Sequence, residues 1–276
     1  MKDFIKFMFA SMVGFILANI VIGILSFIAV AAIVGSMMTF TKKFETGKEV
    51  KIMENAILKI DLANPIIEQP VDNPFAELGS IFGEAPTPVS LRDMIRSIEM
   101  AAEDEKITGI YLRTDFSASS FATMEDIRKA LKNFKESGKF IYAYGDIIDQ
   151  RAYYVSSLAD SIYMHPEGIM NFSGLNSEKV FIKGMFEKLG VTTDVVRTGK
   201  FKSAGEMFSE KEMSEANEEQ SRRLLETIYD HFIKELSESR GISMEDLRSI
   251  ANELKIRTPE GAVEYKFVDR LAYKDQ

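Results

Sequence analysis

The fold of this chain follows from the segment Lys139-Phe140-Ile141-Tyr142-Ala143-Tyr144, an apolar run with the length and residue types of a β-strand. A short helix is predicted over residues 150–158, and a further strand, Ser161-Ile162-Tyr163-Met164, comes directly after it. A strand, a helix and a strand with such short connections form a unit of two parallel strands joined by a right-handed crossover.

The same alternation continues toward the N-terminus. Two more strands are predicted, at Ala56–Asp61 and Gly109–Arg113, and two amphipathic helices, at 90–102 and 123–136. Ser90 is a suitable N-cap for the first of these helices. The segment 68–88 carries four prolines and two glycines, and we expect it to be a long exposed loop.

The alternation also continues toward the C-terminus. His165-Pro166-Glu167-Gly168 predicts a turn, residues 177–189 a helix and residues 191–196 a β-rich segment. Three helices are predicted after these, a long one from a Ser214 cap to Gly241, one over 243–254 and one over 258–265. Strands and helices that alternate in this way predict an α/β architecture with a largely parallel sheet and flanking helices.

The N-terminus is more apolar than the rest of the chain. No charged residue occurs between Phe7 and Phe40, and about 20 apolar residues are enough to cross a hydrocarbon core. A cleaved signal peptide has an apolar core of only roughly 7–15 residues, so a retained transmembrane anchor is predicted. The expected boundaries are a tail over 1–6, the anchor over 7–41, a polar juxtamembrane connector over 42–55 and an α/β domain over 56–276.

Composition excludes several classes of site. The 276 residues carry a net charge of −8 and include no cysteine and only two histidines. Disulfides and thiolate metal sites are therefore excluded. With two histidines, the chain offers few candidates for the histidine of a Ser-His-Asp triad. An acidic chain without a basic, aromatic-interleaved patch is not typical of a nucleic-acid-binding protein. Because the sequence contains no glycine-rich phosphate loop, metal-ligand cluster or nucleophile elbow, we expect no cofactor and no metal.

One candidate site follows from the sheet. Ligands of parallel sheets bind at the carboxyl ends of the strands, which nominates the segments 145–150, 166–173 and 198–203 together. The last of them contains Lys202, between a β-rich run and a long helix. A lysine in such a junction is either an ordinary solvated side chain or, when desolvated, a general base. The neighbouring Lys200 is read as a surface charge.

Several motifs together carry a resemblance to a known family. They are Gly145–Tyr154, Ser157-Leu158-Ala159-Asp160-Ser161-Ile162, Pro166-Glu167-Gly168, Gly199-Lys200-Phe201-Lys202-Ser203-Ala204 with Glu206 and Phe208, and Ala262 with Phe267-Val268-Asp269. With the N-terminal anchor, they resemble signal peptide peptidase A, also called protease IV, over nearly the whole chain after the anchor. The Lys202 segment is the most specific of them.

This resemblance implies a Clp protease/crotonase-like fold and a serine endopeptidase with a Ser-Lys dyad, which degrades cleaved signal peptides at the membrane. In long-form members of the family two copies of the domain follow one another, the first supplying the lysine and the second the serine. Lys202 matches the lysine. A Ser-Lys pair is a known variant of triad chemistry that needs no histidine.

The chain also departs from the family. Where the serine-bearing copy has a serine followed by glycines, this chain has Gln150, Arg151 and Ala152. An amide is no acyl-accepting nucleophile, so we expect this copy to lack a complete site and to be the lysine-bearing half of a long-form enzyme. The remaining serines that could act as nucleophiles, although a cap or turn hydrogen bond is their ordinary role, are Ser156, Ser157, Ser173 and Ser203.

Functions from different classes therefore compete. The first is the lysine-bearing half of a membrane-anchored Ser-Lys endopeptidase that acts on signal peptides with a serine-bearing second copy. The second is a non-catalytic membrane assembly or scaffold subunit. Acyl-CoA chemistry is a third and weaker option, because crotonases share the implied fold.

Two signals disagree about topology. The lysines after the anchor, at 42, 43, 48 and 51, outnumber those before it, at 2 and 6, and by the positive-inside rule this would place the large domain in the cytoplasm. The family resemblance implies an extracytoplasmic domain on the periplasmic side. We expect the latter, since a short N-terminal tail is easily retained. The resemblance also implies homo-oligomers.

Overall fold

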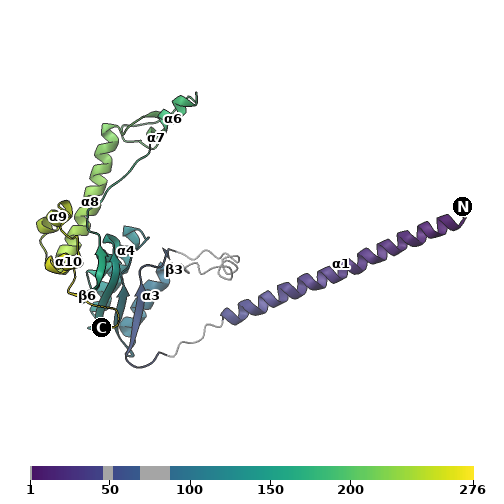
Figure 1. Cartoon of the computed structure of the whole chain (residues 1–276), viewed down its shortest axis with the longest axis horizontal. Coiled ribbons are helices and arrows are strands. Elements are labelled where there is room, and N and C mark those ends of the chain that lie inside the picture. Colours follow the sequence, from purple (N-terminus) through teal and green to yellow (C-terminus); the bar gives the residue numbers. More distant parts are fainter. Residues whose placement is uncertain (1, 46–51, 69–87) are drawn as a thin grey trace. The chain divides into compact units, whose positions relative to one another are not determined.

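The computed structural model describes residues 2–45, 52–68 and 88–276, which fall into two compact units, Met1–Lys51 and Ile52–Gln276 (Figure 1). The first unit contains helix α1 (Lys2–Glu45). Its segment Asp3–Ala32 is long and apolar enough to cross a membrane by length and composition. All of the described side chains in that segment are exposed, so within its own unit this apolar surface has no protein core to pack on.

The second unit is built on a five-stranded sheet with the order β1-β4-β5-β6-β7, in which all neighbours run parallel. Its strands are β1 (Ala56–Asp61), β4 (Ile107–Arg113), β5 (Phe140–Ile148), β6 (Ser161–Met170) and β7 (Arg270–Leu271). A separate parallel pair is formed by β2 (Ile66–Ile67) and β3 (Val89–Ser90). The predicted α/β architecture with a parallel sheet is confirmed.

Most helices of this unit begin at a polar cap. The helices are α3 (Leu91–Glu103), α4 (Phe121–Lys135), α5 (Gln150–Ser156), α6 (Lys183–Lys188), α7 (Glu206–Ser209), α8 (Glu215–Arg240), α9 (Met244–Asn252) and α10 (Pro259–Glu264). Helices α6 and α7 do not begin at such a cap. Ser90, Ser214 and Thr258 each accept a hydrogen bond from the backbone N–H three residues on. Gly241 ends α8 with a φ of 65°, as its predicted stop signal requires.

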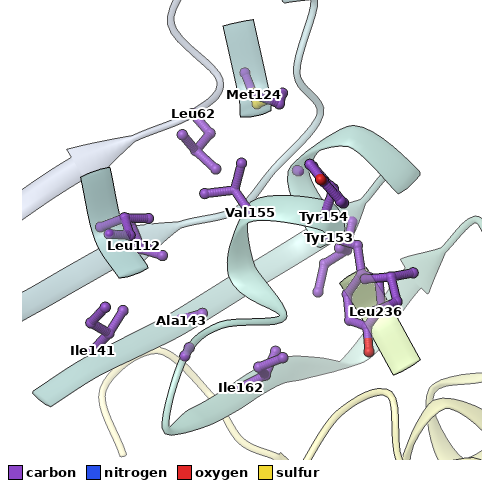
Figure 2. Packing of buried hydrophobic residues seen from close by; sticks show 14 of the residues in the cluster. Leu62, Leu112, Met124, Ile141, Ala143, Tyr153, Tyr154, Val155, Ile162 and Leu236 are labelled. Carbon is purple, nitrogen blue, oxygen red and sulfur yellow. The ribbon is translucent and has the colours of Figure 1, made fainter. Parts of the chain in front are cut away.

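The core joins the sheet to α4, α5 and the second half of α8. Alternate residues of β4, β5 and β6 are buried in it, and Figure 2 shows Leu112, Ala143 and Ile162 among them. Tyr154 of α5 lies 5.4 Å from the ring of Phe232 on α8. This aromatic packing fixes the C-terminal half of α8 to α5.

Strand β6 is longer than predicted. His165–Gly168 was expected to form a turn, but these residues continue the strand, so that prediction is wrong. The reason lies in the pairing with β5, which runs on to Ile148: the register shifts between Gly145 and Ile147, and the extra residues of β6 are accommodated there. Gly168 fits this irregularity because a Cβ would come within 2.7 Å of the Asp146 carbonyl oxygen.

Residues 175–213, which we call the arm, contain less regular structure than predicted. Residues 177–189 were expected to form a helix, but only Lys183–Lys188 do so, and the β-rich segment 191–196 forms no strand. Figure 1 shows α6 and α7 at the end of α8 that is remote from α10 and β6. The predicted loop over 68–88 lies almost wholly outside the described residues.

Candidate functional site

Lys202 lies on an exposed turn of the arm, directly before α7. Its backbone N–H donates to the Gly199 carbonyl oxygen at 3.3 Å, and Gly199 has a φ of 90°, which only glycine adopts readily. The Lys202 side chain is exposed and forms no hydrogen bond or ion pair with any described residue. The neighbouring Lys200 amine lies 5.5 Å from the centre of the Phe201 ring.

Glu206, four residues later, is buried with 1% of its surface exposed. Its carboxylate accepts hydrogen bonds from Arg197 at 2.7 Å, from the Ser214 hydroxyl at 2.6 Å and from the Asn217 amide at 2.8 Å. Burial by itself would raise the pKa of Glu206, but the hydrogen bonds from Ser214, Asn217 and Arg197 outweigh it and lower that pKa to about 2. Glu206 is therefore ionised at neutral pH.

Gln150 occupies the first turn of α5 at the carboxyl end of β5. Its side-chain nitrogen donates to the Gly174 carbonyl oxygen at 2.7 Å, and its side-chain oxygen accepts from the backbone N–H groups of Ser173 at 3.0 Å and Gly174 at 2.9 Å. Both ends of the amide are thus bound to the chain that leaves β6. We call this set of three hydrogen bonds the Gln150 clasp.

The residues after Gln150 fill the space that glycines would leave open. Ala152 is fully buried in the core, and its backbone N–H donates to the Asp149 carboxylate at 2.8 Å. The Arg151 guanidinium lies 3.4 Å from Asp149 and 5.8 Å from the centre of the Phe116 ring. The Ala152 N–H is therefore used to begin a helix, with Asp149 as the N-cap.

Ser156 and Ser157 are structural residues. They are 0% and 1% exposed, and their hydroxyls donate to the backbone carbonyl oxygens of Tyr153 and Tyr154 at 3.3 Å and 3.0 Å. Arg128 also donates to Ser157, at 2.7 Å. No substrate carbonyl can reach either hydroxyl. Ser173 is exposed beside the clasp, and Ser203 is half-buried beside Lys202.

The structure brings together two of the three segments that were nominated as one site. Strand pairing and the Gln150 clasp join residues 145–150 to residues 166–173. The Lys202 segment is bound instead, through Glu206, to Ser214 at the start of α8, whereas Gly174 lies beside Tyr229 of the same helix. Residues 214 and 229 of one helix are about 22 Å apart. Lys202 is therefore joined to the start of α8, and Gln150 lies beside its middle.

A hollow of about 420 Å³ lies beside the clasp. Ser173 and Gly174 line one side of it, and Leu225 and Tyr229 of α8 line the other. It is open and mixed in polarity, as expected of a surface groove rather than a closed cofactor pocket. Among the described residues, no group of three or more acidic or histidine side chains could hold a metal ion.

Sequence reasoning missed the role of Glu206. The residue was part of the motif, but nothing in the pattern indicates that its carboxylate is buried against Arg197 and α8. The clasp was also missed, although the rule that ligand sites gather at the carboxyl ends of strands correctly places residues 150 and 173 together.

Known proteins resemble this chain along much of its length. Residues 133–276, just over half of it, match the family model described as Peptidase family S49. The chain is 34% identical over 165 residues to the chloroplastic serine protease SPPA of Arabidopsis thaliana. The aligned residues cover 60% of this chain and 24% of that protein. The chain is 32% identical over 228 residues to Protease 4 of Salmonella typhi, 78% of this chain and 37% of that protein.

Protease 4 of Haemophilus influenzae is a further relative, 34% identical over 167 residues, with 60% of this chain and 27% of that protein covered. The chain thus spans about a quarter to two fifths of the length of these relatives. Their similarity and the match to the family model agree with the resemblance seen in the motifs. The chain belongs to peptidase family S49, and its parallel sheet with flanking helices is the α/β arrangement of the Clp protease/crotonase-like fold of that family.

Proposed function

We propose that this chain supplies the general-base lysine, Lys202, of a membrane-anchored S49 serine endopeptidase whose nucleophilic serine comes from a second, serine-bearing copy of the domain. One observation carries the proposal. In this peptidase-family chain the Lys202 side chain is exposed and has no side-chain partner among the described residues. Gln150, at the position of the serine, is hydrogen-bonded to the backbone instead.

The chemistry needs a neutral amine. In a Ser-Lys dyad the lysine takes the proton of the serine hydroxyl as its oxygen attacks the peptide carbonyl carbon, and returns a proton to the leaving amine. A lysine amine with the ordinary pKa of about 10.4 is protonated at neutral pH, and desolvation favours its neutral form. Because Lys202 is exposed in the isolated chain, the serine-bearing copy must cover the arm to activate it.

The arm is suited to being covered. Its exposed apolar side chains include Val180 at 71%, Leu189 at 67% and Val196 at 90% exposure. Burying such side chains in an interface is favourable, which supports assembly with the serine-bearing copy and into homo-oligomers. In this proposal α1 is the retained anchor, the domain lies on the periplasmic side and cleaved signal peptides are the substrates. A reporter fused to the C-terminus gives a cytoplasmic signal if this topology is wrong.

The test is to produce the chain together with a serine-bearing S49 domain and to follow cleavage of an apolar peptide. We expect Lys202→Ala to lower kcat by about 10²–10⁴-fold, the usual contribution of a general base. Lys200→Ala is the matched control, and its kcat should stay within about twofold because it removes a surface charge. Cleavage that survives Lys202→Ala contradicts the proposal.

A non-catalytic scaffold subunit is the second candidate, and the Gln150 clasp favours it, because that clasp closes this copy's own nucleophile position. A scaffold predicts that the chain copurifies with an S49 enzyme whose cleavage rate does not change when Lys202 is replaced. The same set of variants therefore separates the two functions.

A further inference from the structure

Glu206 is the only buried side chain of the arm, all of whose residues are described. Carboxylates are almost never fully buried unless they are paired, so its position needs an explanation. The explanation lies in where its partners come from in the chain.

The Arg197–Glu206 ion pair, at 2.7 Å, closes a loop of which Lys202 occupies the middle. Lys202 comes five positions after the arginine and four positions before the glutamate. Both ends of the turn that carries the amine are thus joined through one carboxylate.

The same carboxylate fixes that loop to α8. Ser214 is the N-cap of the helix: its hydroxyl accepts from the Asn217 N–H at 3.3 Å and donates to Glu206 at 2.6 Å. The side chain of Asn217 donates to Glu206 as well, at 2.8 Å, and its oxygen accepts a hydrogen bond from Lys179. An anion at the N-terminus of a long helix is further stabilised by the helix dipole.

Apolar contact supports the polar network. A Cβ at Gly205 would come within 2.3 Å of a methyl carbon of Val195, so the chain before the loop packs directly on the backbone near its end. The segments on either side of Lys202 therefore lie in contact, and only glycine fits at this position.

We propose that Glu206 is the positioning residue of Lys202: its carboxylate closes the loop 197–206 through Arg197 and holds that loop on the first turn of α8, so that the amine meets the serine of the second copy in one position. This inference rests on the proposed function of Lys202. A base must lie within hydrogen-bond reach of the proton that it takes, and a misplacement of about 1 Å costs on the order of 10²-fold in rate.

The test compares Glu206→Gln with Glu187→Gln in the full-length chain in detergent micelles, produced with and without the serine-bearing domain. Glu187 is the matched control, because it also lies in the arm and forms an ion pair at 2.8 Å, with Lys211, but is exposed. We expect Glu206→Gln to speed amide hydrogen exchange across residues 198–209 at least tenfold, to lower kcat at least tenfold and to change KM less than twofold. Glu187→Gln should change none of these. Gly205→Ala is a second variant with the same expected outcome.

Three readouts keep the inference separate from the proposed function. Unchanged exchange and unchanged kcat in Glu206→Gln would overturn it. Loss of exchange protection around Phe232 and Leu236 in that variant would also overturn it, because Glu206 would then be a general stability residue. If Lys202→Ala leaves cleavage intact while Glu206→Gln still loosens residues 198–209, the proposed function fails and the positioning of the loop stands without a catalytic role.

Discussion

The body of the second unit and its arm are held together in opposite ways. In the body, the sheet and its helices share one apolar core, in which aromatic rings such as Tyr153, Phe232 and Phe267 are at most 1% exposed. In the arm the single fully buried side chain is an ionised glutamate, and its apolar side chains are half-buried or exposed. One region is stabilised by burial and the other by a charge network.

The two regions differ in the contacts that keep them ordered. A core of many apolar contacts is cooperative and stable in isolation, whereas a segment with few buried contacts opens at low cost. The general base that we propose in the arm therefore needs local contacts that hold it in place, and the Glu206 network supplies such contacts. Three changes, taken from the largest expected effect to the smallest, can break or sharpen this comparison.

The largest effect is expected in the body. Phe232 of α8 packs between the rings of Phe121 at 5.7 Å and Tyr154 at 5.4 Å. Phe232→Ala should lower the free energy of unfolding by about 3–5 kcal/mol through lost burial and the cavity that remains. Phe201→Ala in the arm removes a half-exposed ring. It should change the free energy of unfolding by no more than about 0.5 kcal/mol. Denaturant titration followed by near-ultraviolet circular dichroism measures both, and similar losses would show that the arm shares the core.

Acid should release the arm before the body. The pKa of Glu206 falls from its ordinary value near 4.5 to about 2 on folding, so its contribution is complete above the unfolded pKa and disappears as the pH falls from about 4.5 to 2. The shift corresponds to about 3 kcal/mol of local stability. Hydrogen exchange of residues 198–209, corrected for its intrinsic pH dependence, should report the loss.

Glu206→Gln provides the control for this acid effect, because an amide does not titrate. Exchange in the variant should be fast throughout and should show no transition between pH 4.5 and 2. A transition that persists in the variant would assign the acid effect to another carboxylate.

The sequence predicts the body much better than the arm, and the reason is physical. The strands and helices around Ile110, Ile141 and Ile162 have a face that is buried, so their apolar periodicity is realised in the fold. Residues 177–189 carry a similar periodicity, but only six of them are helical. These six form α6, which buries no side chain. Without a packing partner, a short amphipathic pattern does not reach the length at which a helix is stable.

The candidate site divides in the same way. Lys202 was nominated from its motif, and it stays a prediction until the variants are measured. The partners of Glu206 could not be predicted, because they depend on how the chain turns at Gly199 and on the approach of Val195 to Gly205. Neither feature has a periodic signal: the first is a single backbone conformation at Gly199, and the second is a contact between residues ten positions apart.

The smallest of the three effects tests the border between the two regions. Gln150 binds the backbone of Ser173 and Gly174 where the chain leaves the body for the arm. Gln150→Ala leaves two N–H groups and one carbonyl oxygen without their partner. Because these groups are partly open to water, we expect the free energy of unfolding to fall by an amount at the lower end of about 1–3 kcal/mol. Denaturant titration measures it, and exchange of residues 171–176 should rise.

Gln150→Ser separates the clasp from nucleophile chemistry. The shorter side chain also loses the clasp, so its stability should match that of the alanine variant. The new hydroxyl should give no cleavage by the chain alone, because Lys202 belongs to the opposite end of about 22 Å of helix. Cleavage by Gln150→Ser that is lost again on adding Lys202→Ala would mean that arm and body of neighbouring copies meet, with the lysine of one chain serving the serine of the next. The arm would then be ordered by assembly as well as by Glu206. Its exposed apolar side chains would help to hold Lys202 in place by forming the interface between copies.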